Sequence, residues 1–326
     1  MKGGHMLTRY VTSFYSNLFL NAAEELNLNH EIIDEERDLI RIYSKGKDFL
    51  IIDCTTQFNN AIGRIFAKNK NLTSKYLRRH QLPAPQFKLF KDFNKALKHA
   101  VSCNQHIVIK PSNASLAKGI TVKPKGEDQI RKALEGAFQV SETVMVEDFI
   151  KGKDYRITVF NDKVIAVTYR APGHVVGNGK DTVKKLIADK NEKRESLEKP
   201  LITLREKDLD FLYNRDLDLN YIPEEGEFVR LQLGCDRDIG GDRHRIEIRE
   251  IHPDNIALFK KVAKTLKLRY CGIDFISPDI TKSHKEIKCG INEVNSAPHQ
   301  DVHYFDTPRG DNYSCRRILK TFFELA

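Results

Sequence analysis

Two stretches decide the fold: Cys271-Gly-Ile-Asp-Phe-Ile276 and Ile291-Asn-Glu-Val-Asn-Ser-Ala-Pro298. The first is an apolar run of strand length interrupted by Asp274, and the second is a more polar stretch of strand length that carries Glu293 and Asn295. Side chains two residues apart share one face of a strand, so Glu293 and Asn295 point the same way. If the two strands are neighbours, three oxygen ligands converge, which suits Mg²⁺ with water and substrate phosphates. An isolated acid at a strand end is more often merely solvated, but burying an unpaired carboxylate is costly.

Lysine residues next to predicted loops form the second signal. Lys110 ends the predicted strand 106–110 and precedes a loop that reaches Gly119. A lysine at such a place supplies a point charge for a phosphate, and the N–H groups of the loop add further donors. Lys70 begins another lysine-bearing segment. A single lysine in such a position is more often an ordinary surface residue. The prediction that these lysines bind phosphate therefore depends on their order in the chain relative to the other motifs.

The predicted strand 143–149 ends in acidic residues and runs into Gly152. A strand that meets a glycine turn predicts a hinge between two lobes. The exposed backbone of such a strand is suited to pair with the edge of adenine, and Asp154 is placed to accept the ribose hydroxyls. A strand that merely ends in a turn explains the same residues equally well.

The remaining periodicity predicts a mixed α/β (α+β) chain in which helices cover largely antiparallel strands. The predicted helices are 13–26, 59–80, 93–102, 128–140, 184–217, 255–266 and 315–325. The predicted strands are 38–43, 48–53, 106–110, 120–122, 143–149, 155–160, 163–169, 229–233, 271–277 and 288–294, with loops at 172–179 and 235–242.

Composition narrows the function class. The chain has 326 residues, and 54 Lys and Arg against 45 Asp and Glu give a formal charge of +9. That excess indicates anionic partners, but the absence of an arginine block argues against nucleic acid. No apolar run approaches the roughly 20 residues of a membrane span. Six cysteines without close pairs and without a secretory signal predict free thiols in the cytoplasm, and residues 1–5 are compatible with a cloning remnant.

The order of these pieces resembles the ATP-grasp family of carboxylate–amine ligases. It looks most like the glutathione synthetase domain of bifunctional bacterial glutathione enzymes and the ATP-grasp domain of cyanophycin synthetase. The resemblance runs from about residue 59 to the C-terminus. Its most specific stretches are Val146-Glu-Asp-Phe-Ile-Lys-Gly-Lys-Asp-Tyr-Arg156, Arg170-Ala-Pro-Gly-His-Val-Val-Gly-Asn-Gly179, Cys271-Gly-Ile-Asp-Phe275 and Asn292-Glu-Val-Asn-Ser-Ala-Pro298.

The resemblance implies four groups of site residues. ATP would be bound by Lys70, Lys110, Lys118, Gly119, Glu147, Asp148, Phe149, Ile150 and Asp154. Mg²⁺, with Mn²⁺ as an alternative, would be bound by Asp274, Glu293 and Asn295. The catalytic positions would be Lys110, Arg156 and Arg170. The substrate would meet His174, Gly177, Gly179, Gln232, Asp236, Gly240, Gly241 and His303.

The resemblance also implies an architecture and a reaction. An N-terminal α/β region (1–68) would precede a central lobe (69–151) and a C-terminal lobe (152–326), with ATP between the last two. The enzyme would activate an amino-acid or short-peptide carboxylate as an acyl phosphate and join it to an amine, releasing ADP and phosphate. Glutathione synthetase-like chemistry is one version, another amino-acid or peptide ligation is the other, and a homodimer stays open.

Departures from the family pattern keep an alternative open. Ala114 and Ala117 stand where the phosphate loop prefers glycine, and Gln232 replaces an arginine. The alternative is therefore a nucleotide-binding regulatory or scaffold protein with weakened catalysis. His299 and His303 have the spacing of a helical zinc pair, but Pro298 precedes them and a third ligand is missing from the pattern.

Overall fold

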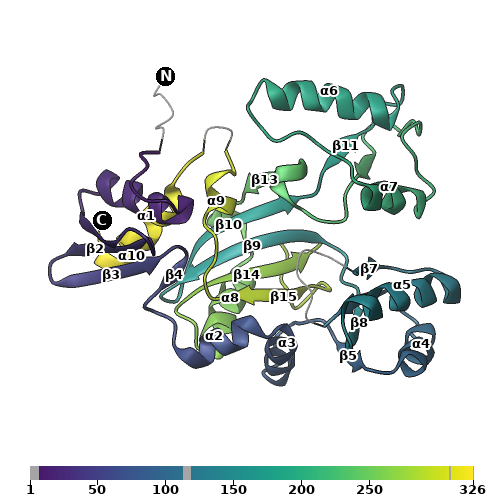
Figure 1. The fold of residues 1–326 in the computed structure, drawn as a ribbon, viewed down its shortest axis with the longest axis horizontal. Coiled ribbons are helices and arrows are strands. Elements are labelled where there is room, and N and C mark those ends of the chain that lie inside the picture. Colours follow the sequence, from purple (N-terminus) through teal and green to yellow (C-terminus); the bar gives the residue numbers. More distant parts are fainter. Residues whose placement is uncertain (1–6, 113–118, 308–309, 326) are drawn as a thin grey trace.

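The computed structural model describes residues 7–112, 119–307 and 310–325. At its centre is an antiparallel five-stranded sheet in the order β13-β10-β9-β14-β15 (Figure 1). Its strands are β9 (Lys153–Phe160), β10 (Lys163–Ala171), β13 (Asp242–Arg245), β14 (Tyr270–Ser277) and β15 (Gly290–Asn295). The sequence analysis required the strand of Asp274 to neighbour the strand of Glu293 for the predicted ligands to converge, and β14 does pair with β15.

The central sheet has one apolar face and one polar face because its strands alternate in character. On β9, Tyr155, Ile157 and Val159 are buried in a core with helix α8 (Pro253–Thr265). The residues of β9 that alternate with these three, such as Asp154 and Arg156, therefore point to the opposite face. Polar side chains from all five strands share that face, which we call the polar face.

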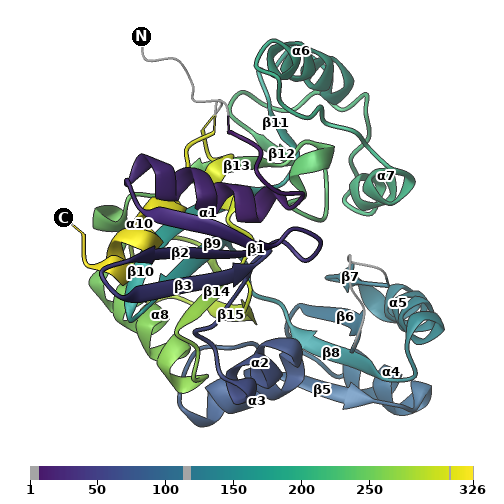
Figure 2. The same cartoon turned by 60° about the vertical axis from the view of Figure 1, so that its left-hand side comes forward.

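A second sheet, in the order β5-β8-β6-β7, lies beside the central sheet (Figure 2). It consists of β5 (Phe87–Phe90), β6 (Ile107–Pro111), β7 (Thr121–Val122) and β8 (Val144–Asp148). Helices α4 (Phe93–Val101) and α5 (Gly126–Val140) pack on one side of it through a core of their own. The side chains of Lys110 on β6 and Glu147 on β8 lie on the other side of this sheet, where they form an ion pair.

The two ends of the chain meet in a third unit. Strands β1 (Asn29–Asp34), β2 (Leu39–Ser44), β3 (Lys47–Ile52) and β4 (Thr55–Thr56) form a sheet in that order. Helices α1 (Phe14–Glu25) and α10 (Tyr313–Phe323) lie together against it (Figure 2). The buried residues of this unit are continuous with Phe160 and Tyr270 of the central sheet, so the C-terminal helix ties the first sheet to the central one.

A small subdomain projects from β10 at the upper right of Figure 1. It contains β11 (His174–Val176), β12 (Phe228–Arg230), α6 (Val183–Glu195) and α7 (Glu206–Tyr213) around a separate apolar core. The prediction of a plain loop over 172–179 is wrong there, because His174–Val176 pairs with Phe228–Arg230.

The prediction that 59–80 is mostly helical is confirmed, although the helix is not continuous. It is divided into α2 (Ala61–Lys68) and α3 (Lys70–Arg79) at Asn69, whose backbone is extended. The Asn69 side chain accepts a hydrogen bond from the Leu72 N–H and so caps α3, which is a typical role of asparagine. The break places Lys70 in the first turn of a new helix that packs against β15.

Four shorter elements complete the fold. They are η1 (Arg237–Ile239), η2 (Ile248–Glu250), α9 (Asp301–Tyr304) and strand β13, none of which the sequence pattern predicted. Within the described ranges, no helix combines the length and apolar character that a membrane span requires.

Candidate active site

Strand register gathers the polar residues of the site. Asp274 on β14 is directly opposite Arg156 on β9 and Glu293 on β15. Asp154, two residues before Arg156, is directly opposite Arg170 on β10. Directly opposite residues in antiparallel strands have neighbouring side chains on one face. Four strands therefore bring two arginines and three carboxylates onto the polar face.

Asp274 is the electrostatic centre of this group. One of its oxygens lies 2.5 Å from Arg156 Nε and the other 3.0 Å from Arg170 Nη2, and its side chain is only 7% exposed. Burial alone would raise the pKa of Asp274, but Arg156 and then Arg170 outweigh burial and lower it. Asp274 is therefore held as a carboxylate.

Asp154 shares one of these arginines. It accepts hydrogen bonds from Arg170 Nη2 at 2.6 Å and from Nε at 3.2 Å. Burial raises the pKa of Asp154, Arg170 opposes that effect, and the neighbouring charge of Asp274 adds to it. The pKa of the Arg170 guanidinium is raised overall, because Asp274 and Asp154 outweigh its burial. Arg170 thus links the two acids.

The three predicted metal ligands lie together. Glu293 faces Asp274, Asn295 is opposite Gly272, and residues two apart on β14 and β15 share a face. Glu293 forms an ion pair with Lys70 at 2.9 Å. Among the residues that the structure describes, no group of three or more His, Cys, Asp and Glu side chains is gathered for a metal. Two carboxylates and one amide nevertheless fit Mg²⁺, which completes its shell with water and phosphate oxygens.

Gly272 makes room for this arrangement. A Cβ atom added there would lie 2.7 Å from Pro298 Cβ and 3.3 Å from the Arg156 side chain. A side chain here would overlap Pro298 and press against the Arg156 side chain that reaches Asp274. The Cys271-Gly-Ile-Asp motif therefore supplies both the carboxylate of Asp274 and, at Gly272, the space that Pro298 and the Arg156 side chain occupy.

The second sheet carries Lys110, Glu147 and Asp148 of the predicted nucleotide site, and Phe149 and Ile150 directly follow its strand β8. Lys110 of β6 and Glu147 of β8 form an ion pair at 2.9 Å, with side chains 18% and 12% exposed. The Asp148 N–H donates to the Gln86 carbonyl and the Phe149 N–H to the His106 carbonyl. Ile150 is buried and approaches Gly290 of β15, so it joins the two sheets. Lys118 lies outside the described residues, as do Ala114 and Ala117, and Gly119 has a positive φ of 70°.

His303 is buried beneath the polar face. Its Nε2 and Nδ1 atoms each lie 2.8 Å from a hydroxyl, that of Thr158 on β9 and that of Thr168 on β10. Burial lowers the pKa of His303 far below its ordinary value, and the positive charges of Arg156, Arg245 and Arg170 lower it further. A neutral imidazole has one donor and one acceptor nitrogen, which two hydroxyl groups can satisfy. These contacts make His303 a bridge between two strands.

Gln232 is also buried and fully bonded. Its Nε2 donates to the carbonyls of Thr203 and Ile239, and its Oε1 accepts from the Gly173 N–H. The amide therefore fastens the subdomain to the loop that precedes β13. No free donor is left on it for a substrate in this arrangement.

The other predicted substrate residues shape turns around that loop. Gly241 N donates to the Asp236 carbonyl, and Gly240 has φ 107° with Ile202 too close for a side chain. Gly177 packs against Glu224, whose carbonyl leaves no space for a Cβ, and Gly179 has φ 69°.

His174 stands apart from these glycines at the start of β11. It stacks on Phe228 with ring centroids 4.5 Å apart, and its Nδ1 donates to the Pro172 carbonyl. Burial lowers the pKa of His174.

Arg243 is a site residue that the sequence analysis missed. It lies on β13, directly opposite Arg170. The segment Asp242-Arg-His-Arg245 contains no apolar residue, so it lacks the apolar–polar alternation that predicts a strand.

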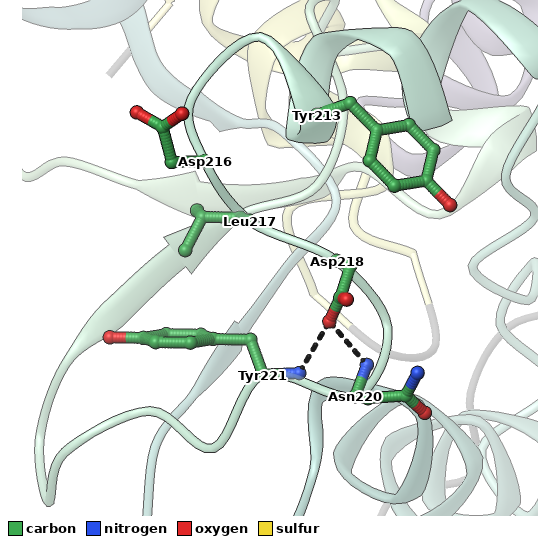
Figure 3. A pocket seen from close by; sticks show the side chains of 6 residues that line it. All are labelled: Tyr213, Asp216, Leu217, Asp218, Asn220 and Tyr221. Atoms are coloured by element: carbon green, nitrogen blue, oxygen red, sulfur yellow. Dashed lines mark hydrogen bonds between the residues drawn. The ribbon is translucent and has the colours of Figure 1, made fainter.

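One surface pocket, of about 360 Å³, lies in the turn after α7 (Figure 3). The Asp218 carboxylate there accepts hydrogen bonds from the backbone N–H groups of Asn220 and Tyr221. Those bonds stabilise the turn itself, and Figure 3 shows Asp216 pointing away from them. This pocket contains none of the predicted site residues.

Comparisons with known proteins agree with this geometry. The family model of the phosphoribosylglycinamide synthetase ATP-grasp (A) domain matches residues 68–173. The glutathione biosynthesis bifunctional protein of Clostridium perfringens is 29% identical over 94% of this chain and 40% of its own length. Cyanophycin synthetase of Trichormus variabilis is 31% identical over 76% of this chain and 28% of its own length.

A solved structure is also similar to this chain, in this case by its fold. The crystal structure of a bifunctional glutathione synthetase from Pasteurella multocida superposes with a TM-score of 0.68 and 25% identity, covering 96% of this chain and 44% of that one. The chain has the ATP-grasp fold, and its sequence is similar to ATP-grasp ligases. It spans less than half the length of these relatives.

Proposed function

We propose that this chain is an ATP- and Mg²⁺-dependent ligase. It activates the carboxylate of an amino acid or short peptide as an acyl phosphate and joins it to an amine as an amide, releasing ADP and phosphate. The observation that carries the proposal is the polar face, where Asp274, Glu293, Arg156 and Arg170 stand in register on adjacent strands. The names of the relatives, glutathione and cyanophycin synthetases, support the same class of reaction.

The first step brings anions together, and the residues of the chain offset their repulsion. Lys110 binds nucleotide phosphate, and Arg156 and Arg170 face the phosphoryl and acyl groups. Asp274, Glu293 and Asn295 would hold Mg²⁺, with Mn²⁺ as an alternative, and the bound metal neutralises phosphate charge. Since Arg170 bridges Asp154 and Asp274, an incoming anion competes with these carboxylates for its guanidinium.

The second step forms the amide. A carboxylate is a poor electrophile in water, whereas an acyl phosphate has a good leaving group. The amine attacks its carbonyl carbon, the C–O bond to phosphate breaks, and inorganic phosphate leaves. We place ATP between the central lobe, 69–151, and the C-terminal lobe, 152–326, beyond the N-terminal region 1–68. A cytoplasmic location and a homodimer stay predictions.

The test of function is ADP release from Mg-ATP across a matrix of amino acids and short peptides, with products followed by mass spectrometry. We expect ADP formation that requires both a carboxylate and an amine, and a product lighter than their sum by one water. Glutathione-type pairs belong in the matrix beside other amino-acid pairs. Tight ATP binding without turnover on any pair would favour the alternative, a nucleotide-binding regulatory or scaffold protein.

Lys110→Ala should weaken ATP binding by about tenfold to a hundredfold, because a charged hydrogen bond is worth about 1.5–3 kcal/mol. Isothermal titration calorimetry with ATP measures the change. Lys132→Ala, at an exposed position of α5, is the matched control and should bind as the parent does. An unaltered affinity in Lys110→Ala would remove this lysine from the nucleotide site.

A further inference from the structure

A second hollow, of about 660 Å³, opens at one end of the second sheet, beside the C-terminal end of α4 and the N-terminal end of α5. These two helices lie side by side on that sheet (Figure 2). The wall is completed by Phe149 and Lys151, from the segment that leads to the central sheet, and by Lys288, which precedes β15. We call this hollow the α4–α5 pocket. Its size is within the range of pockets that bind small molecules.

The α4–α5 pocket is separate from the predicted nucleotide site. Lys110 and Glu147 lie on the side of the second sheet that faces away from α4 and α5, whereas both helices contribute to the pocket. Among the described residues of the predicted nucleotide site, Phe149 alone is in the pocket wall. A ligand in the pocket would therefore not take the place of ATP.

The lining of the α4–α5 pocket has an unbalanced positive charge. Three lysine side chains line it: Lys123, Lys151 and Lys288. In the part of the chain that the structure describes, no carboxylate lies within ion-pair distance of any of the three, and the Lys123 ammonium is 4.5 Å from the centre of the Phe149 ring. Glu127, the one acid among the described lining residues, is already paired with Arg131 at 2.9 Å. The partner that this lining suits is therefore an anion.

The start of α5 adds backbone donors to the same wall. The first N–H groups of a helix have no partner within the helix, and Lys125 at the N-cap of α5 makes no side-chain hydrogen bond to them. Gly126, the first helical residue, lines the pocket, and a Cβ atom added there would meet no atom within 4 Å. The backbone at the start of this 15-residue helix therefore borders open space. Free N–H groups at a helix N-terminus beside lysines favour phosphate among the common anions.

The rest of the wall is apolar. Ile107 of β6 and Ile130 of α5 are buried side chains that reach the pocket, and the ring of Phe149 lies beside them in the lining. Inorganic phosphate would use the lysines and the helix start but would leave this apolar surface in contact with water. A ligand that also carries a flat apolar ring would cover it, which is favourable.

We propose that the α4–α5 pocket binds an aromatic phosphate. The phosphate would lie among Lys123, Lys151 and the start of α5, and the ring would lie against Ile107, Ile130 and Phe149. This site is independent of the proposed ligase reaction, because its ligand is not expected to react. Phe149 and Lys151 flank Ile150, which joins the two sheets, so the ligand would be bound where the two lobes meet.

The test measures binding by isothermal titration calorimetry with three probes: 1-naphthyl phosphate, 1-naphthol and inorganic phosphate. We expect the parent protein to bind 1-naphthyl phosphate at least about tenfold more tightly than either of the other two, because only this probe combines the ring with the charge. Lys123→Gln and Lys151→Gln should each lower the affinity for 1-naphthyl phosphate about tenfold. Neither change should alter the affinity for 1-naphthol.

Lys132→Gln is the matched control, because Lys132 is an exposed lysine of α5 outside the pocket lining. It should bind 1-naphthyl phosphate as the parent does, and so should Lys110→Ala. A loss of affinity in Lys110→Ala as large as that in Lys123→Gln would place the probe in the nucleotide site and overturn the proposal. No binding of 1-naphthyl phosphate, equally tight binding of 1-naphthol, or unchanged affinity in both pocket variants would overturn it as well. ADP release in the turnover assay bears only on the ligase function, so the two proposals can fail separately.

Discussion

Asp274→Asn should reduce ADP formation by at least about 10²–10³-fold, the effect expected when one preorganised charge is removed from a site of this kind. It should also lower the free energy of unfolding by about 3–5 kcal/mol, because it breaks a buried ion pair and leaves two guanidinium groups with less counter-charge. Asp274 is 7% exposed and is paired with both Arg156 and Arg170. Steady-state ADP release and urea denaturation measure the two effects.

Two further variants separate the roles of Asp274. Glu293→Gln should lose turnover to a similar degree but keep nearly all of the stability, since Glu293 is 24% exposed and its partner Lys70 is 50% exposed. Asp48→Asn breaks an exposed ion pair with Arg41 on the N-terminal sheet and should change neither quantity by much. Undiminished ADP formation in both Asp274→Asn and Glu293→Gln would refute the metal assignment.

His303→Ala should lower the free energy of unfolding by about 2–5 kcal/mol at pH 7. The loss combines the cost of the cavity that the imidazole leaves with the cost of two hydroxyl groups that lose their hydrogen-bond partner. The imidazole is completely buried between Thr158 and Thr168. Urea denaturation measures this loss. His80→Gln, at the exposed C-terminal end of α3, is the control and should change stability little.

The same variant should change the pH dependence of stability. Burial lowers the pKa of His303 in the folded protein, so below about pH 6.5 the unfolded chain takes up a proton that the folded one does not. The stabilising effect of the neutral imidazole is present above that pH and is lost as the pH falls. The parent should therefore lose up to about 1.4 kcal/mol per pH unit from this residue between pH 6 and 5. Identical pH slopes in the parent and His303→Ala would refute this account.

Much of the site followed from the sequence, because strand alternation is a local property. A period of two puts Glu293 and Asn295 on one side of a strand wherever the strand lies. The apolar residues around Asp274 required a buried strand, and a buried carboxylate required partners. The predicted ion-binding face rests on those two facts, whereas the pairing of β14 with β15, on which the face depends, is seen only in the structure.

Other features depended on contacts between distant segments. Lys70 meets Glu293 because a helix break at Asn69 turns α3 onto β15, and a helical pattern alone does not reveal that break. His303 looked like a substrate residue, yet it bridges two strands from a short helix more than 130 residues further along the chain.

The sequence by itself determined that the segments around Asp274 and Glu293 are strands and which of their side chains share a face, and it predicted the residues that would hold nucleotide and metal. The tertiary structure alone decided the order β13-β10-β9-β14-β15, and with it the partner of every charge. That order links Arg170 to Asp154 and Asp274 and leaves Arg243 without an acid. The physical reason is that periodicity acts over a few residues, whereas an ion pair depends on which strands are neighbours and on their register.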